Sequence, residues 1–257
     1  MRSLVVSKPS LLLTLFMFLA LPSWLMAEGE LEADFVLPEV YPWAWEDPDG
    51  KVRGLLVEML HELDETIAPI VNYRLRPLPR AILELQQGEA MFSTLYQAPE
   101  VDEAGEPLFE LVTVDIVVIG VHQHIPQDAP TSLDDLDDEP VGFIHGTYYG
   151  EAFRAHEGIR RVGVRDMNHG LELMEQGRLS AMVGSDLTLA EAFESGEIPE
   201  PEKVKVLFRL DSNTGWLYRS RGVEHPEVEQ AVVEGLRAFK AEGRLDALFS
   251  PRLHASE

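Results

Sequence analysis

The sequence of 257 residues contains no cysteine. This excludes disulfide bonds, thiolate metal sites and a lipid-modified cysteine at a signal cleavage point. Basic residues are also scarce, since 21 Lys and Arg stand against 45 Asp and Glu, for a formal net charge of −24. Binding to phosphate groups needs basic patches, so this balance disfavours nucleic acid and anionic membranes as partners. We interpret the acidity as a surface property and not as a sign of a cationic ligand.

No stretch after the start of the chain is long and apolar enough to be a transmembrane helix. At the start, residues 11–21 (LLLTLFMFLAL) follow Arg2 and Lys8 and precede the small residue Ala27 and a polar segment. The run is shorter than the roughly 20 residues that span a bilayer. This arrangement is typical of a secretory signal peptide, with an uncleaved anchor as the alternative. Removal of residues 1–27 takes the formal net charge from −24 to −26, and a periplasmic location is expected.

The rest of the chain alternates strand-like and helix-like patterns, which is typical of an α/β architecture. Strands are expected at 34–40, 71–78, 91–96, 108–121, 141–144, 161–164, 180–185, 204–210 and 215–220. Helical segments are expected at 55–67, 80–88, 132–140, from about 148, and at 168–177, 187–195 and 226–243. The long strand 108–121 and the later segment 204–220 are expected to cross between two lobes, the second inserted in the first.

Three local signals support this assignment of elements. Gly88 closes the expected helix 80–88, as a left-handed glycine commonly ends a helix. Ser132 precedes SLDDLDDEP and is placed to cap a helical turn. Asp49 and Gly50 predict a turn after the first strand.

Aromatic residues are concentrated in VYPWAW, directly after the first expected strand. Alternate residues of an extended segment face the same side, so Tyr41, Trp43 and Trp45 are expected to share one side. Aromatic side chains also dominate protein cores. The sequence therefore leaves two interpretations open, packing in the core and contact with a small molecule.

Five segments resemble, in order, the extracellular solute-binding proteins of family 3, the type II periplasmic binding proteins best known for polar amino acids. They are YPWAWEDPDGKVRGLLVEML, RAILELQQGEAMFST, SLDDLDDEPVGFIHGTYYG, MEQGRLSAMVGSD and HPEVEQAVVEGLRAFKAEGRLDALF. The resemblance covers residues 34–251. It implies a two-lobed type II fold hinged by two crossover strands, with lobe one formed by 28–115 and 210–257 and lobe two by 116–209.

The resemblance also implies a function. Such proteins close around a small-molecule solute and deliver it to the membrane permease of an ABC importer, which is a ligand-driven domain closure. A monomer without cofactor or metal is expected. The positions that correspond to ligand contacts in the family are Tyr41, Trp43, Trp45, Thr94, Tyr96, Gly146, Thr147 and Tyr148. In the glycine-threonine turn, exposed amide groups and the Thr147 hydroxyl suit a polar or anionic group.

Both charged anchors that the family uses for an α-amino acid depart from the pattern. The arginine that binds the ligand carboxylate corresponds to Val101, and valine provides no charge-assisted hydrogen bond. The aspartate that binds the ligand ammonium corresponds to Ser185, with Asp186 one position further on. Two interpretations of Arg80 stay open: a substitute contact for an anionic group of the ligand, and a surface arginine at the start of a helix. The expected solute is a small polar organic molecule, an amino acid or similar.

Three other functions are alternatives to this interpretation. A metal site at His122 and His124 has no third ligand, and HELDE lacks the second histidine of a zinc-binding helix. An enzyme of the periplasmic dehydratase type would use cleft residues such as His145, Glu100 and Asp186 for acid–base chemistry. The third is a ligand-binding subunit of a membrane sensor, which the sequence does not distinguish from a transport protein.

Overall fold

The computed structural model describes residues 31–145, 147–195, 198 and 200–250. The expected signal peptide (1–27) and Gly146 lie outside these residues. The strands are β1 (Glu32–Pro38), β2 (Trp45–Glu46), β3 (Val52–Arg53), β4 (Ile70–Arg76), β5 (Phe92–Tyr96), β6 (Gly105–Val121), β7 (Pro140–Ile144), β8 (Arg160–Val164), β9 (Ala181–Ser185) and β10 (Val204–Ser220). The helices are α1 (Leu55–Asp64), α2 (Leu78–Gln87), α3 (Pro99–Ala104), α4 (Glu151–Ala155), α5 (Met167–Glu175), α6 (Asp186–Glu194), α7 (Pro226–Ala241) and α8 (Arg244–Phe249), with 3₁₀ turns η1 (His122–His124), η2 (Asp134–Leu136) and η3 (Pro201–Lys203).

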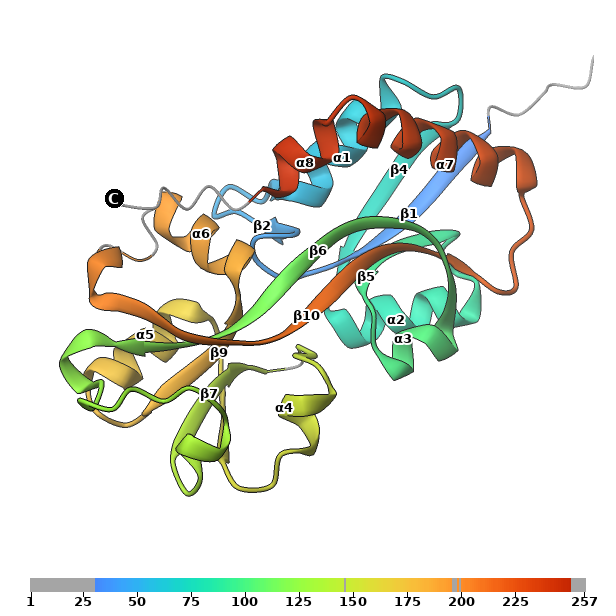
Figure 1. The fold of residues 1–257 in the computed structure, drawn as a ribbon. Coiled ribbons are helices and arrows are strands. Elements are labelled where there is room, and N and C mark those ends of the chain that lie inside the picture. Colours follow the sequence, from blue (N-terminus) through green and yellow to red (C-terminus); the bar gives the residue numbers. More distant parts are fainter. Residues whose placement is uncertain (1–30, 146, 196–197, 199, 251–257) are drawn as a thin grey trace, which may run out of the picture.

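Two long strands hold the fold together. Strands β6 and β10 have 17 residues each and pair antiparallel from Gly105–Ser220 at one end to Val121–Val204 at the other. They occupy the centre of an eight-stranded sheet with the order β4-β1-β5-β10-β6-β9-β7-β8. Figure 1 shows them running from the upper right half of the molecule to the lower left half. The molecule therefore has two lobes joined by one shared ladder, an α/β fold of the two-lobed type.

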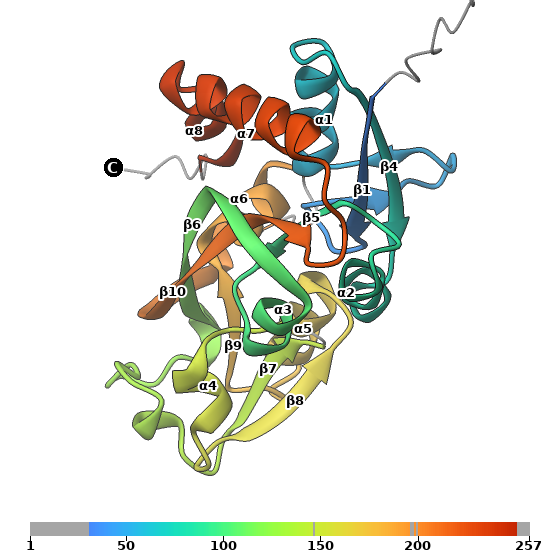
Figure 2. The same ribbon diagram turned by 90° about the vertical axis from the view of Figure 1, so that its right-hand side faces the viewer.

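The first lobe, defined as β1 to α3 with α7 and α8, contains the parallel strands β4, β1 and β5. Helices α1, α7 and α8 cover one face of these strands, and α2 and α3 cover the other (Figures 1 and 2). Helix α7 forms because its apolar residues recur at helical spacing, so Val228, Val232, Leu236 and Phe239 all face the core.

The second lobe, defined as η1 to η3, repeats this layering on a smaller scale. Strands β8, β7 and β9 are parallel, and β9 pairs antiparallel with β6. Helix α5 packs Met167 and Met174 against Met182 of β9, in a core cluster separate from that of the first lobe. The Asp166 side chain caps this helix by accepting a hydrogen bond of 2.8 Å from the His169 amide.

The structure confirms the predicted fold class, with local differences. Gly88 ends α2 with φ of 73°. Ser132, in contrast, caps no helix, because the Asp135 carboxylate accepts hydrogen bonds from the Thr131 and Ser132 amides and only a 3₁₀ turn forms. The predicted pair of strands at 204–210 and 215–220 is one strand, β10, with register shifts that include Gly215/Trp216.

One buried carboxylate organises an edge of the first lobe. Glu84 of α2 is 2% exposed, and its two oxygens accept hydrogen bonds of 2.9 Å from Arg74, Arg76 and Arg80. Arg80 also pairs with Glu89 at 2.8 Å. Burial opposes the ionisation of Glu84, but the three guanidinium groups outweigh it and lower its pKa from 4.5 to about 2.

We predict that replacement of Glu84 by glutamine lowers the free energy of unfolding by about 2–3 kcal/mol at pH 7, because three guanidinium groups lose their shared anion. Since the folded pKa is depressed, the stabilisation is complete above about pH 4.5 and is lost as the pH falls towards 2. Urea denaturation at pH 7 and at pH 3 measures both effects.

The matched control is Glu89→Gln, which removes an exposed partner of Arg80. It should change stability by less than about 0.5 kcal/mol. Equal losses for Glu84→Gln and Glu89→Gln would contradict the central role of Glu84.

Candidate ligand-binding site

A cavity of about 390 Å³ lies where the two lobes meet. Its volume is in the range of small-molecule sites, roughly 300–1,000 Å³. Seven aromatic side chains contribute to its wall: Tyr41, Trp43, Tyr96, Tyr148, Tyr149, Trp216 and Phe249. Most of the remaining lining is aliphatic, including Leu56, Leu78, Ile82, Val101 and Ile144.

The segment 40–44 places two of these aromatics. Val40 and Ala44 form a β-bridge that closes a tight turn, and the Tyr41–Pro42 peptide bond is cis. The first amides of α1 donate to this turn, from Leu55 to the Pro42 carbonyl (3.1 Å) and from Leu56 to the Trp43 carbonyl (2.9 Å). The turn is therefore fixed to the N-terminus of a helix.

Gly54 allows the turn and the helix to approach closely. Its φ is 128°, and a Cβ atom there would lie 2.4 Å from the Trp43 carbonyl oxygen. No other residue type fits this backbone conformation and this contact without displacement of the turn.

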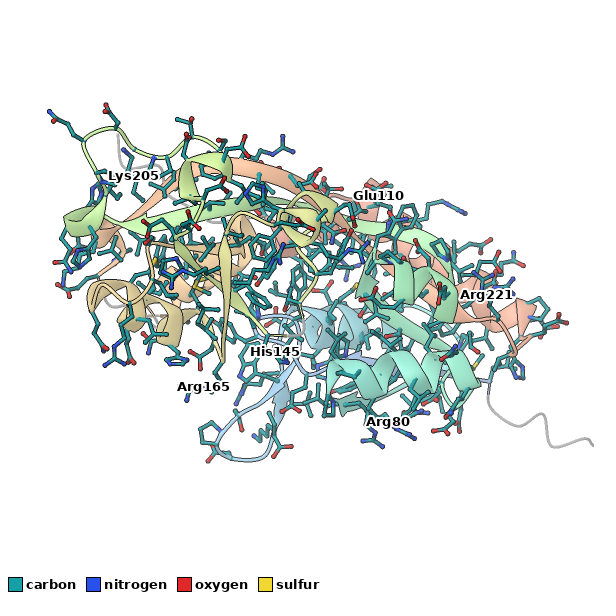
Figure 3. The ribbon with its side chains drawn as sticks, turned by 90° about the horizontal axis from the view of Figure 1, so that it is seen from below. Arg80, Glu110, His145, Arg165, Lys205 and Arg221 are labelled. Carbon is teal, nitrogen blue, oxygen red and sulfur yellow. The ribbon has the colours of Figure 1, made fainter. Side chains whose placement is uncertain are left out.

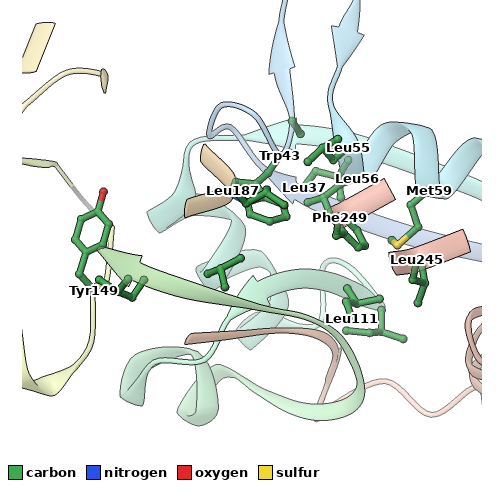
Figure 4. Packing of buried hydrophobic residues seen from close by; sticks show 14 of the residues in the cluster. Leu37, Trp43, Leu55, Leu56, Met59, Leu111, Tyr149, Leu187, Leu245 and Phe249 are labelled. Carbon is green, nitrogen blue, oxygen red and sulfur yellow. The ribbon is translucent and has the colours of Figure 1, made fainter. Parts of the chain in front are cut away.

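Because the segment is a turn, the predicted alternation fails and the three aromatics do not share one side. Trp43 is 7% exposed, and its ring centroid lies 5.2 Å from that of Tyr96. It also packs against Phe249, with ring centroids 5.9 Å apart (Figure 4). Trp45 lies in the β2–β3 hairpin, outside the cavity lining, and packs on Tyr41 at 4.8 Å.

Tyr41 connects the two lobes. Its hydroxyl donates to Ser195 Oγ at 2.9 Å and contacts the Glu191 carbonyl at 3.3 Å. Both acceptors belong to α6 or its C-terminal cap in the second lobe. One aromatic side chain thus contributes to the cavity wall and also bridges the lobes at its edge.

Four polar groups of the cavity lining have no hydrogen-bond partner among the described residues. Buried side-chain atoms are hydrogen-bonded in the large majority of cases. Among the described residues, five buried side-chain N or O atoms have no hydrogen-bond partner, and four of them belong to cavity-lining side chains. These four are Thr94 Oγ1, Tyr96 Oη, Asn213 Nδ2 and Trp216 Nε1.

The four groups come from two neighbouring strands. Thr94 and Tyr96 lie on β5 and pair with Leu217 and Gly215 of β10, next to Asn213 and Trp216 on the same strand. Such a concentration of unpaired groups is the arrangement expected where a ligand completes the hydrogen bonding.

The cavity has little charge in its wall. Among the described lining residues there is no Lys, Arg or His, and Glu100, an exposed residue, is the one carboxylate. Asp186 lies just outside, where its Oδ1 accepts from the amides of Leu187 (2.8 Å) and Asp115 (3.1 Å). Burial raises the pKa of Asp186 despite these amides. Burial, followed by the charge of Asp186, also raises the pKa of Tyr96, so the Tyr96 hydroxyl stays protonated.

The structure brings most of the predicted site residues to one place. Seven line the cavity: Tyr41, Trp43, Thr94, Tyr96, Thr147, Tyr148 and Ser185. Ser185 acts there as the N-cap of α6, since its hydroxyl accepts from the Thr188 amide at 3.2 Å and donates to the Thr188 hydroxyl. Gly146 lies outside the described residues, and Trp45 and Asp186 are outside the lining.

Arg80 is not at the cavity. It lies at the outer surface of α2 (Figure 3), and its guanidinium binds Glu84 and Glu89 as described above. The alternative interpretation of Arg80, a surface arginine at a helix start, describes its position. The proposed substitute for the missing carboxylate anchor is therefore wrong.

Sequence reasoning missed Asn213, Trp216, Tyr149 and Phe249 as cavity residues. A signal existed for the first two, because DSNTGW is a polar interruption between apolar segments of one long strand. Their partners on β5 are more than a hundred positions away in the sequence. Their proximity to Thr94 and Tyr96 follows only from the register of the sheet.

Other kinds of site find little support in the part of the chain that the structure describes. No group of three or more His, Asp or Glu there is placed to hold a metal ion. His124 Nε2 instead lies 3.0 Å from the Glu175 carbonyl oxygen. Within the same residues, no helix has the length and apolar character needed to cross a membrane.

We predict that Thr94→Val leaves the stability of the ligand-free protein unchanged or raises it by up to about 1 kcal/mol. Valine has nearly the shape of threonine and removes a buried hydroxyl that has no partner in the fold. Urea denaturation of protein refolded without ligand measures the change.

The adjacent residue provides the control, since the buried Ser93 hydroxyl donates to the Val36 carbonyl at 2.7 Å. Ser93→Ala should therefore destabilise by about 1 kcal/mol. If Thr94→Val costs as much as Ser93→Ala, the Thr94 hydroxyl is satisfied within the fold and is not held for a ligand.

By sequence, no protein-family model and no curated protein matches this chain. By structure, it is similar to an ancestral amino-acid-binding protein, described as a precursor of cyclohexadienyl dehydratase, with a TM-score of 0.68 and 18% identity over 85% of this chain and 93% of that one. It is also similar to the L-cystine solute receptor of Neisseria gonorrhoeae in the unliganded open conformation (TM-score 0.60, 18% identity, 86% and 91% covered).

A third similar structure is a histidine kinase sensor domain with similarity to periplasmic binding proteins. The TM-score is 0.67, with 16% identity over 87% of this chain and 96% of that one. The similarity extends over nearly the full length of each of these structures. The chain therefore has the two-lobed fold of the periplasmic solute-binding proteins of the amino-acid-binding type.

Proposed function

We propose that this protein captures a small organic solute in the cavity between its lobes and delivers it to the permease of an ABC importer. The observation that carries the proposal is the set of four unpartnered polar groups in the cavity lining. A solute that hydrogen-bonds to them removes the cost of burying them without partners. The two-lobed fold supports the proposal, since ligand sites are common at such interfaces.

Binding would be coupled to closure of the lobes. Thr94 and Tyr96 belong to the first lobe, while Thr147, Tyr148 and Ser185 belong to the second. A solute that contacts both sets stabilises the closed arrangement over an open one, because only the closed form provides all contacts. Strands β6 and β10 are the connections about which the lobes would move. The hydrogen bond from Tyr41 to Ser195 would add to the stability of the closed form.

Export to the periplasm is part of the proposal. The basic, apolar and small-residue pattern of residues 1–27 and the absence of cysteine support a secreted protein without a lipid anchor. We propose that the mature chain begins near residue 28 and acts as a monomer.

A sensor role is the second candidate. Its support is the similarity to the sensor domain of a histidine kinase, 96% of which is covered. The same cavity would then bind a signal molecule, and the closed form would dock on a membrane receptor in place of a permease.

The enzymatic alternative has weaker support in the geometry. Of the three residues considered for acid–base chemistry, Glu100 lines the cavity, whereas His145 and Asp186 are outside the lining. General acid–base catalysis needs such groups within hydrogen-bonding reach of the substrate. We therefore propose binding without turnover.

The test is a thermal-shift screen of residues 28–257, refolded without ligand, against amino acids, organic acids, amides, polyamines and compatible solutes. A ligand that binds only the native state raises the melting temperature by linkage. We expect a hit that also lowers the radius of gyration in small-angle scattering, since closure compacts the two lobes.

The affinities of single-residue variants show whether the ligand that is found binds in the cavity. Trp43→Leu should weaken binding roughly tenfold through loss of an aromatic contact, and Thr147→Val should weaken it from the other lobe. Arg80→Ala, away from the cavity, should leave the affinity unchanged. A hit that is insensitive to both cavity variants, or that leaves the radius of gyration unchanged, would contradict binding between the lobes.

A further inference from the structure

The cavity is unsuited to a free α-amino acid. A buried carboxylate needs a partner of opposite charge or several strong donors, and the described lining contains no Lys, Arg or His. Val101, at the position of the family's arginine, is 3% exposed and packs in an apolar cluster with Leu85, Leu95 and Tyr218. A ligand carboxylate would also be repelled by the carboxylates of Glu100 and the nearby Asp186.

The ammonium group of an amino acid lacks its anchor as well. Ser185 replaces the family's aspartate, and its hydroxyl is hydrogen-bonded to Thr188 in both directions. Asp186 Oδ1 is bound to two backbone amides outside the lining. Glu100, the carboxylate of the described lining, is exposed to solvent, where a charge contact contributes little.

The wall suits a flat apolar body. Trp43 and Tyr96 meet edge to face at 89°, Phe249 packs on Trp43 with ring centroids 5.9 Å apart, and the three rings form one aromatic side. Tyr148 and Trp216 pack with the apolar cluster around Leu95 and Val101 and form a second aromatic side of the cavity. Aromatic rings bury a large apolar area and stack or meet edge to face with a planar partner.

The unpartnered groups call for acceptors on the ligand. The Asn213 amide nitrogen and the Trp216 indole nitrogen are donors only, and the Thr94 and Tyr96 hydroxyls also donate. All four lie on the paired strands β5 and β10 and line the cavity. Thr94 and Tyr96 belong to the side of Trp43, whereas Trp216 pairs with Leu95 and belongs to the second side. Neutral oxygen atoms, such as those of carbonyl or ether groups, satisfy these donors without introducing a charge.

From these observations we propose that the cavity binds an uncharged, largely apolar molecule with a planar ring and at least one oxygen acceptor. Aromatic amides, ketones and esters are the chemical class that fits. The inference rests on the proposed solute-binding function and specifies its ligand.

The experiment compares four matched probes that share one phenyl ring: 3-phenylpropionamide, 3-phenylpropionate, 3-phenylpropylamine and L-phenylalanine. They are screened with a library of neutral aromatic amides, ketones and esters at millimolar concentration by thermal shift and then by calorimetry. We expect hits among the neutral compounds. We also expect 3-phenylpropionamide to bind at least about tenfold tighter than the three charged probes, because the described cavity wall offers their charged groups no buried partner of opposite charge.

A pair of variants tests the wall. Trp216→Phe keeps an aromatic ring but removes the indole donor, and should weaken the best neutral hit by about three- to tenfold. Trp45→Phe makes the same substitution outside the cavity lining and should leave the affinity unchanged. Equal effects of the two variants would overturn the assignment of Trp216 as a donor.

The outcomes separate this inference from the proposed function. Hits confined to the zwitterion, the anion or the cation, and weakened by Trp43→Leu, would overturn the uncharged ligand but uphold solute binding. No hit in either the neutral or the charged set would overturn both. Neutral hits that depend on Trp43 and Trp216 would support both.

Discussion

The antiparallel pairing of β6 with β10 is the interaction on which the rest of the structure depends. The two strands are shared by both lobes, so the same ladder fixes the relative position of the cavity walls. On one side, β10 pairs with β5 and brings Asn213 and Trp216 beside Thr94 and Tyr96. On the other, β6 pairs with β9, and Ile116 lies opposite Ser185. Groups from segments far apart in the chain meet in the cavity because they are neighbours of this ladder.

The cavity combines two properties that conflict in a protein interior. Its wall is mostly aromatic and aliphatic, yet it holds most of the unpartnered buried polar atoms of the described residues. Elsewhere the protein satisfies its buried polar groups closely, as with Glu84 and its three arginines or Ser93 and the Val36 carbonyl. A local departure from good hydrogen bonding within a well-satisfied fold is typical of a functional region.

Much of the fold could be predicted from the sequence, because its elements have strong local signals. The apolar run 108–121 predicted most of β6, and Gly88 marked the end of α2. Helix α3 was missed, since PEVDEA has no helical apolar period. For the site, Trp45 was misplaced because alternation applies to extended chain and the segment before it closes a turn. Arg80 was misassigned because its partner Glu84 also binds two arginines of β4, a strand whose position the sequence does not give.

The way in which two helices begin beside the cavity has an electrostatic consequence. The first amides of α1 donate to the carbonyls of Pro42 and Trp43, and those of α6 donate to the side chains of Ser185 and Asp186. The positive ends of both helix dipoles are therefore compensated by the chain itself. The long-range field that a solute meets is then set by the acidic surface, with its formal net charge of −24. Anions are repelled during their approach and cations are attracted, whereas a neutral molecule enters at a rate governed by diffusion and by the width of the opening.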